Sequence, residues 1–162
     1  MDIKKTNPSA LQVGLYFLYL ANKAGKPITN KKLQKLVYYA QAWSLVINKR
    51  KLFADRIEAW VHGPAIRTLY SEYKEFGFSP IKRKVDEDIT EFFLPRDKKL
   101  LDNVWKTYGK LDSEYLEMLT HSEKPWQESR EGLQGDESSN NEISLETIKT
   151  YYLKKLKVAR KA

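Results

Sequence analysis

The side chains of this chain that could do chemistry are two histidines and a scatter of carboxylates. His62 and His121 are the only imidazoles among 162 residues, and the sequence contains no cysteine. The lack of cysteine excludes thiolate metal ligands, cysteine nucleophiles and disulfides. Asp55 and Glu58 precede His62 closely, but a metal usually takes three or four protein ligands. We therefore expect neither a metal site nor a cofactor.

The sequence also lacks the common catalytic motifs. It contains no glycine-rich phosphate loop, no HExxH helix and no GxSxG turn. Both histidines have apolar or aromatic neighbours in the sequence, and a lone histidine in such company is more often structural than catalytic. The residues assemble no nucleophile and no metal for hydrolysis, so we predict that the protein is not an enzyme.

The charge of the chain raises nucleic-acid binding as an alternative. Twenty-nine lysines and arginines against 21 acids give a net charge of +8. The candidate phosphate contacts lie at the start of one expected helix and along the last one: Lys31, Lys32, Lys35, Lys154, Lys155, Lys157 and Arg160. Residues spaced along a helix point in several directions, and cations near its C-terminus complement the helix dipole. We favour a solvated basic surface, with DNA binding as the alternative.

Aromatic residues are numerous, with four tryptophans and ten tyrosines. Trp43 and Trp105 follow helical apolar spacing, which predicts that they belong to the core. Trp60 and Trp126 stand beside turns that contain proline. An aromatic residue at such a place is either a corner of the core or an exposed anchor for a partner, and core packing is the favoured use.

The elements that position these residues are mostly helices. Apolar spacing predicts a mainly α, single compact domain of about six helices, with a small β-sheet inserted near residues 52–85. The expected helix starts are Ser9, Thr29 or Asn30, Pro64, Pro95, Asp112 or Ser113, Pro125 and Ser144. Residues 37–47 are apolar nearly all round, which is typical of a central helix. The strand candidates are residues 52–53, 57–61 and 80–85.

The chain divides by composition into three parts. Residues 1–131 form the expected core, residues 132–143 an acidic polar loop, and residues 144–162 a basic C-terminal helix. The apolar face of that helix must be buried, either on the core or on a partner. The sequence therefore allows the protein to be a homodimer. The apolar run at residues 11–20 is too short to cross a bilayer. We expect a cytoplasmic protein without membrane insertion.

Three linked segments resemble a known family. The first is FADRIEAWVHGPAI at residues 53–66, followed by Tyr70 and Tyr73; the others are LQKLVYYAQAW at residues 33–43 and LTHSEKPW at residues 119–126. Together they make the chain, from residue 9 to about residue 131, similar to the Panacea family of antitoxins, also called SocA-like or phage-associated GepA-like. Ala65 stands where valine is usual.

The resemblance implies a mostly helical antitoxin that is encoded beside a toxin and neutralises it by direct protein contact, without enzyme activity. Its motif residues are candidate partner contacts or scaffold residues: Glu58, Trp60, His62, Gly63, Pro64, Tyr70, Tyr73 and Trp126. The alternative function is a DNA-binding transcriptional regulator of its own operon or of a phage or mobile element, using the basic residues named above.

Overall fold

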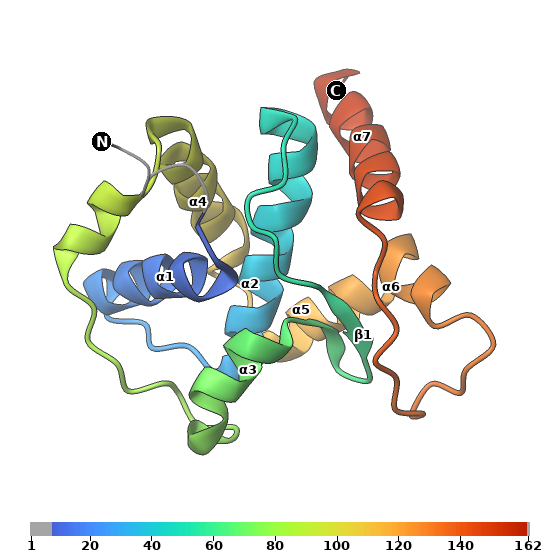
Figure 1. Ribbon diagram of the computed structural model, residues 1–162, viewed down its shortest axis with the longest axis horizontal. Helices are drawn as coiled ribbons and strands as arrows, with labels where there is room; N and C mark the ends of the chain where they lie inside the picture. Colours follow the sequence, from blue (N-terminus) through green and yellow to red (C-terminus); the bar gives the residue numbers. More distant parts are fainter. Residues whose placement is uncertain (1–7, 162) are drawn as a thin grey trace.

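The computed structural model describes residues 8–161, and this part of the chain is mainly helical (Figure 1). Seven α-helices lie within it: α1 Ala10–Ala24, α2 Asn30–Trp43, α3 Arg67–Tyr73, α4 Pro95–Tyr108, α5 Ser113–His121, α6 Lys124–Ser129 and α7 Leu145–Lys161. The other elements are a π-helix, η2 Ser44–Asn48, and two 3₁₀-helices, η3 Lys74–Phe76 and η4 Glu87–Phe92. Strands β1 Glu58–Trp60 and β2 Gly63–Ala65 form one antiparallel hairpin. The predicted fold class is thereby confirmed.

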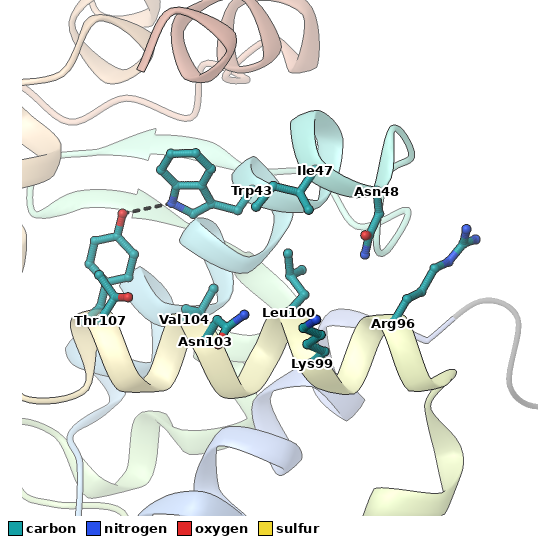
Figure 2. A pocket seen from close by; sticks show the side chains of 10 residues that line it. Trp43, Ile47, Asn48, Arg96, Lys99, Leu100, Asn103, Val104 and Thr107 are labelled. Atoms are coloured by element: carbon teal, nitrogen blue, oxygen red, sulfur yellow. Dashed lines mark hydrogen bonds between the residues drawn. The ribbon is translucent and has the colours of Figure 1, made fainter. Parts of the chain in front are cut away.

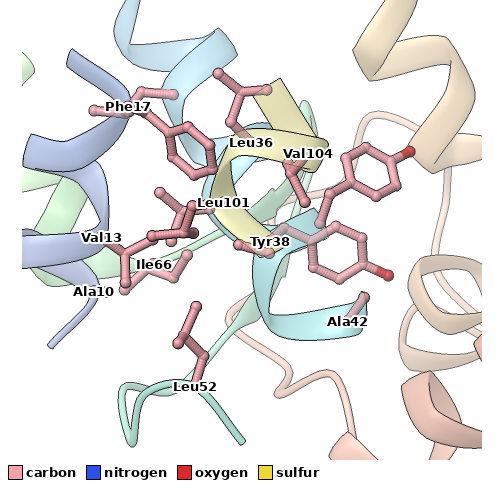
Figure 3. Close-up of a cluster of buried hydrophobic side chains, with 14 of the residues drawn as sticks. Ala10, Val13, Phe17, Leu36, Tyr38, Ala42, Leu52, Ile66, Leu101 and Val104 are labelled. Atoms are coloured by element: carbon pink, nitrogen blue, oxygen red, sulfur yellow. The ribbon is translucent and has the colours of Figure 1, made fainter. Parts of the chain in front are cut away.

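Helix α2 lies at the centre of the molecule, where α1, α4, α5 and α7 pack around it (Figure 1). Figure 3 shows side chains of three helices meeting in the core, among them Phe17 of α1, Leu36 of α2 and Leu101 of α4. All three side chains are fully buried. The apolar residues nearly all round the second half of α2 thus have a simple cause, because a helix enclosed by others keeps little solvent face there.

Local capping chemistry sets several helix starts as predicted. The Ser9 hydroxyl accepts a hydrogen bond from the Gln12 amide, and the Gln12 side chain caps Ser9 in return. Thr29 caps α2 and Asp112 caps α5 in the same way. Pro95 occupies the first turn of α4.

Pro64 contradicts the prediction that it begins a helix. It lies in β2 and pairs with Ala59 of β1, and α3 begins only at Arg67. The chain turns at Val61 and His62, and Gly63, with φ 110°, then begins β2 so that Pro64 continues in extended backbone along β1. Proline is tolerated both in an edge strand and in the first turn of a helix, so the presence of Pro64 alone does not distinguish a strand from a helix start.

Two of the three predicted strands are also wrong. At residues 52–53 the side chain of Gln41, and not a neighbouring strand, takes the backbone hydrogen bonds. Leu52 N donates to Gln41 Oε1 at 2.6 Å, and Gln41 Nε2 donates to Phe53 O at 2.8 Å. At residues 80–85 only Pro80 forms a β-bridge, with Thr29. No neighbouring strand continues that pairing in the described chain.

The C-terminal segments return to the hairpin and to α2. Asn141 O accepts from Ala59 N and Ile143 N donates to Ile57 O, both at 2.8 Å, so residues 141–143 run beside β1. Helix α7 then packs on its own chain, with Tyr152 fully buried. The expected core from residue 1 and the expected helix to residue 162 reach beyond the described residues at either end. Nowhere in residues 8–161 is a helix long and apolar enough to span a membrane.

Candidate functional site

The motif hairpin is held by a buried carboxylate. Glu58 accepts hydrogen bonds from Trp60 Nε1 at 2.8 Å, Arg67 Nη2 at 2.9 Å and Arg56 Nε at 3.2 Å. Burial raises the pKa of Glu58, but the Trp60 hydrogen bond and the two arginines outweigh it and hold the pKa below its usual value. The ionised Glu58 therefore ties the end of β1 to the first turn of α3.

Gly63 and Pro64 seat the turn of the hairpin against α2 and α5. A Cβ on Gly63 would lie 2.6 Å from Lys35 Cε and 2.8 Å from Thr120 Oγ1, so a larger residue does not fit. Lys35 is only 2% exposed, and its amine donates to Pro64 O at 3.3 Å. Burial lowers the pKa of Lys35 to about 7. The start of β2 is thus packed closely against α2 and α5.

Trp126 joins the second motif to the first. Its Nε1 donates to Trp60 O at 2.8 Å, and the His121 ring stacks on it with centroids 3.9 Å apart. The Arg130 guanidinium lies 5.0 Å from the Trp126 ring centroid and donates to Ala59 O at 3.0 Å. Burial lowers the pKa of His121, which favours a neutral ring. These contacts hold α6 on the hairpin.

The remaining predicted motif residues divide between the core and the surface. Tyr73 is buried in the core, whereas Tyr70 is 41% exposed and Trp60 is half-buried. His62 lies at the surface, although its neighbours in the sequence include Trp60 and Val61. Its side chain is exposed, with Nδ1 3.3 Å from a carboxylate oxygen of Glu117.

A cavity of about 680 Å³, which we name the motif groove, opens beside the hairpin. Three aromatic residues line it, namely Trp60, Tyr70 and Phe78, and residues 138–140 form another part of its wall. The Trp60 and Tyr70 rings meet edge to face with centroids 5.1 Å apart, and Phe78 is 88% exposed. The cations in its lining are Lys31, Lys35, Arg67 and Lys74.

Sequence reasoning missed Phe78, Lys74 and residues 138–140 as parts of this groove. An aromatic residue between Gly77 and Ser79, in a polar turn, was the only signal for Phe78. Nothing in the sequence indicates that residues 138–140 lie in the wall of the groove.

A second cavity, of about 510 Å³, lies between α4 and the end of α2 (Figure 2). Trp43 and Ile47 face Leu100 and Val104 across it. Trp43 Nε1 donates to the Tyr108 hydroxyl at 2.9 Å. Trp43 was expected in the core, but it is only half-buried and forms part of this cavity wall, as its packing partners leave one side open. Trp105 is likewise only half-buried, so the core prediction is too strong for both tryptophans.

The candidate nucleic-acid lysines of α2 are engaged within the protein. Lys35 is buried, which removes its amine from the surface that DNA could reach. Lys32 Nζ donates to Gly109 O at 2.6 Å, and Lys31 forms an ion pair with Glu117.

On α7 the candidate contacts are mostly exposed. Lys154, Lys157 and Arg160 are exposed, while Lys155 Nζ lies 3.4 Å from a carboxylate oxygen of Glu123. The start of α2 and the C-terminal end of α7 lie at opposite ends of the view in Figure 1. The two basic groups therefore do not form one surface. No group of three or more metal-ligating side chains is brought together within residues 8–161.

The comparisons with known proteins agree with the geometry of the motifs. The family described as "Antitoxin SocA-like, Panacea domain" matches residues 33–127, from α2 through the hairpin to α6. The chain is 32% identical over 110 residues to "Antitoxin SocA" of Caulobacter vibrioides (strain NA1000 / CB15N). That match covers 62% of this chain and 58% of the relative, and thus less than two thirds of the relative's length. No solved structure matches the chain. The chain belongs to the SocA-like Panacea antitoxin domain family.

Proposed function

We propose that this chain is an antitoxin that neutralises a cognate toxin, encoded nearby, by direct protein contact. Membership of the antitoxin family is the observation that carries the proposal. The antitoxin acts by binding and not by catalysis, either by covering the active surface of the toxin or by holding the toxin in an inactive shape. A stable complex of this kind buries about 1,600 Å² in total.

The motif groove is the surface that best suits such binding. Binding energy in protein interfaces concentrates in a few tryptophan, tyrosine and arginine residues near the centre. Trp60, Tyr70 and Arg67 come together here, inside the family-matched residues, with Phe78 exposed beside them. Gly63 belongs to the lining of the groove, whereas Glu58, Pro64, Tyr73 and Trp126 lie outside the lining and support it without contacting the toxin.

Co-expression tests this function directly. The reading frame next to the gene is induced with and without this chain, and the complex is recovered through an affinity tag on the chain. We expect the neighbour to arrest growth, the chain to restore growth, and both proteins to co-purify. A copy of the gene with an early stop codon is the control that separates the protein from its transcript. Two outcomes would refute direct neutralisation of the neighbouring protein. In the first, that protein does not arrest growth; in the second, it arrests growth but the chain neither restores growth nor forms a complex with it.

A DNA-binding regulator is the second candidate, and exposed cations on α7 are the observation that favours it. Lys154, Lys157 and Arg160 extend along the last turns of the helix. Three phosphate contacts would give a slope of about −2.7 in a plot of log affinity against log salt concentration. Tight binding to the promoter of the operon at moderate salt, with that slope, would support the regulator. Weak binding to any duplex would reflect only the net charge.

Light scattering on the purified chain decides whether it forms a homodimer.

A further inference from the structure

Resting on the antitoxin function proposed above, we propose that the motif groove binds an acidic segment of the partner protein, in which carboxylates flank one large apolar side chain. The groove of about 680 Å³ has the size of a site for a few side chains. It combines an aromatic wall with a cationic lining, and the two parts select different groups of the same segment.

The aromatic wall would receive the apolar side chain. Trp60 of β1 and Tyr70 of α3 are packed edge to face, which fixes both rings, and Tyr70 leaves 41% of its surface to solvent. Phe78, just beyond η3, exposes 88% of its surface beside them. Exposed aromatic side chains gathered in one concavity mark an interaction site, since covering them releases ordered water.

The charges of the lining select carboxylates. The side chains that line the groove include Lys31, Lys35, Arg67 and Lys74 but, among the described residues, no aspartate or glutamate. Lys74 is exposed and forms no ion pair with any carboxylate of residues 8–161. Lys35 adds little to this charge, because its amine is buried and donates to the Pro64 carbonyl. A lining of this sign attracts a negative segment and repels a positive one.

A protein segment fits this surface better than a nucleic acid does. Lys31 is already paired with Glu117, and Arg67 with Glu58, so the excess positive charge is small. Nucleic-acid binding draws its affinity from many phosphate contacts along a track, and single strands stack successive bases on successive aromatic residues. Here two of the three aromatic rings pack on each other and the charges do not form a track.

Peptide selection on the purified chain tests the groove without the toxin. A displayed library of random short peptides is panned on the full chain, and enriched peptides are measured against Lys74→Glu and Phe78→Ser. The controls are Lys106→Glu on α4, which makes the same charge reversal, and Val158→Ser on α7, which also replaces an exposed apolar side chain with serine; both positions lie outside the groove. Circular dichroism verifies that each variant is folded.

We expect the enriched peptides to carry aspartate or glutamate beside an aromatic or large aliphatic residue. Each groove variant should weaken their binding about tenfold, which equals about 1.4 kcal/mol, whereas each control should leave it unchanged. Enrichment of neutral or basic peptides, no enrichment at all, or equal binding to groove and control variants would overturn the proposal. Displacement of the peptides by a single-stranded DNA oligonucleotide at moderate salt would overturn it in favour of nucleic acid.

The outcome is independent of the co-expression experiment. If the neighbour is not toxic but acidic peptides bind the groove, the antitoxin function fails and the groove chemistry stands. If the chain rescues growth but Lys74→Glu and Phe78→Ser rescue as well as wild type and acidic peptides do not bind, the groove proposal fails alone.

Discussion

Trp126 Nε1 donates a hydrogen bond to the backbone carbonyl oxygen of Trp60 at 2.8 Å, and this bond connects two sequence motifs 66 residues apart. The PW pair of the second motif thus has a structural explanation. Pro125 lies in the first turn of α6, and Trp126 on the same turn reaches the strand of the first motif. The two motifs are parts of one scaffold.

Replacing Trp126 with phenylalanine keeps most of the apolar surface but removes the indole donor. We expect a loss of about 1–2 kcal/mol in the free energy of unfolding, because the Trp60 carbonyl loses its partner. Urea denaturation followed by circular dichroism measures it. Trp105→Phe is the control, since within the described chain the Trp105 indole nitrogen donates to no acceptor. Equal losses in both variants would show that ring volume, and not the hydrogen bond, matters.

Gly63→Ala should be strongly destabilising. The new Cβ would meet Lys35 Cε at 2.6 Å and Thr120 Oγ1 at 2.8 Å, on a backbone with φ 110°. Together these effects predict a loss of about 2–4 kcal/mol, measured by thermal or urea unfolding. Gly135→Ala is the matched control, because nothing lies within 4 Å of its Cβ position. A stable Gly63→Ala protein would contradict the close packing of the turn on α2.

Lys35 makes stability depend on pH. Burial lowers its pKa from 10.5 to about 7, so between these values the unfolded chain binds a proton that the folded chain releases. The free energy of unfolding therefore rises with pH across this window. Lys35→Met should stabilise the protein by about 1 kcal/mol at pH 7 and make the rise up to about pH 9 less steep.

Unfolding curves of both proteins at several pH values in that range measure the slope. Glu117 and Lys31 act on Lys35 by their charges in opposite directions, and both are present in the two proteins. The difference between the slopes therefore isolates Lys35. Parallel slopes would mean that Lys35 keeps an ordinary pKa.

Tyr152 attaches α7 to the core through a buried carboxylate. Its hydroxyl donates to Glu123 Oε1 at 2.7 Å, and the Tyr39 hydroxyl donates to the same oxygen at 3.2 Å. Tyr152→Phe should cost about 1–2 kcal/mol, because the buried Glu123 loses a donor. Limited proteolysis should then cut α7 faster. Tyr151→Phe, next to it on the helix and only half-buried, is the control and should change neither measurement. Faster cleavage in both variants would assign the effect to α7 itself.

The sequence predicted those features that depend on neighbouring residues. The sequence predicts the cap at Ser9 and places Thr29 and Asp112 each among two neighbouring candidates, because a side chain and an amide a few residues away suffice to define a cap. Pro64 was misplaced because proline suits both a strand edge and a helix start, and the choice depends on packing against α2.

The long-range features of the site escaped prediction. The sequence predicts Lys35 as a surface cation, whereas the packing of Gly63 against it helps to bury it in the structure. The motif groove combines residues from α2, the hairpin, α3 and residues 138–140. No local sequence pattern predicts that these distant segments lie close together. The two motifs were found as sequences, but their role as a scaffold required the contact between Trp126 and Trp60.

Residues 141–143, which lie beside β1, reach the hairpin late during synthesis of the nascent chain. Synthesis starts at the N-terminus, so the ribosome delivers β1 long before Trp126, Arg130 and residues 141–143, which cover it. While synthesis is still short of Trp126, the emerging hairpin has none of these neighbours. The lining of the groove is therefore complete only after residues 138–140 have left the ribosome, late in the synthesis of the chain.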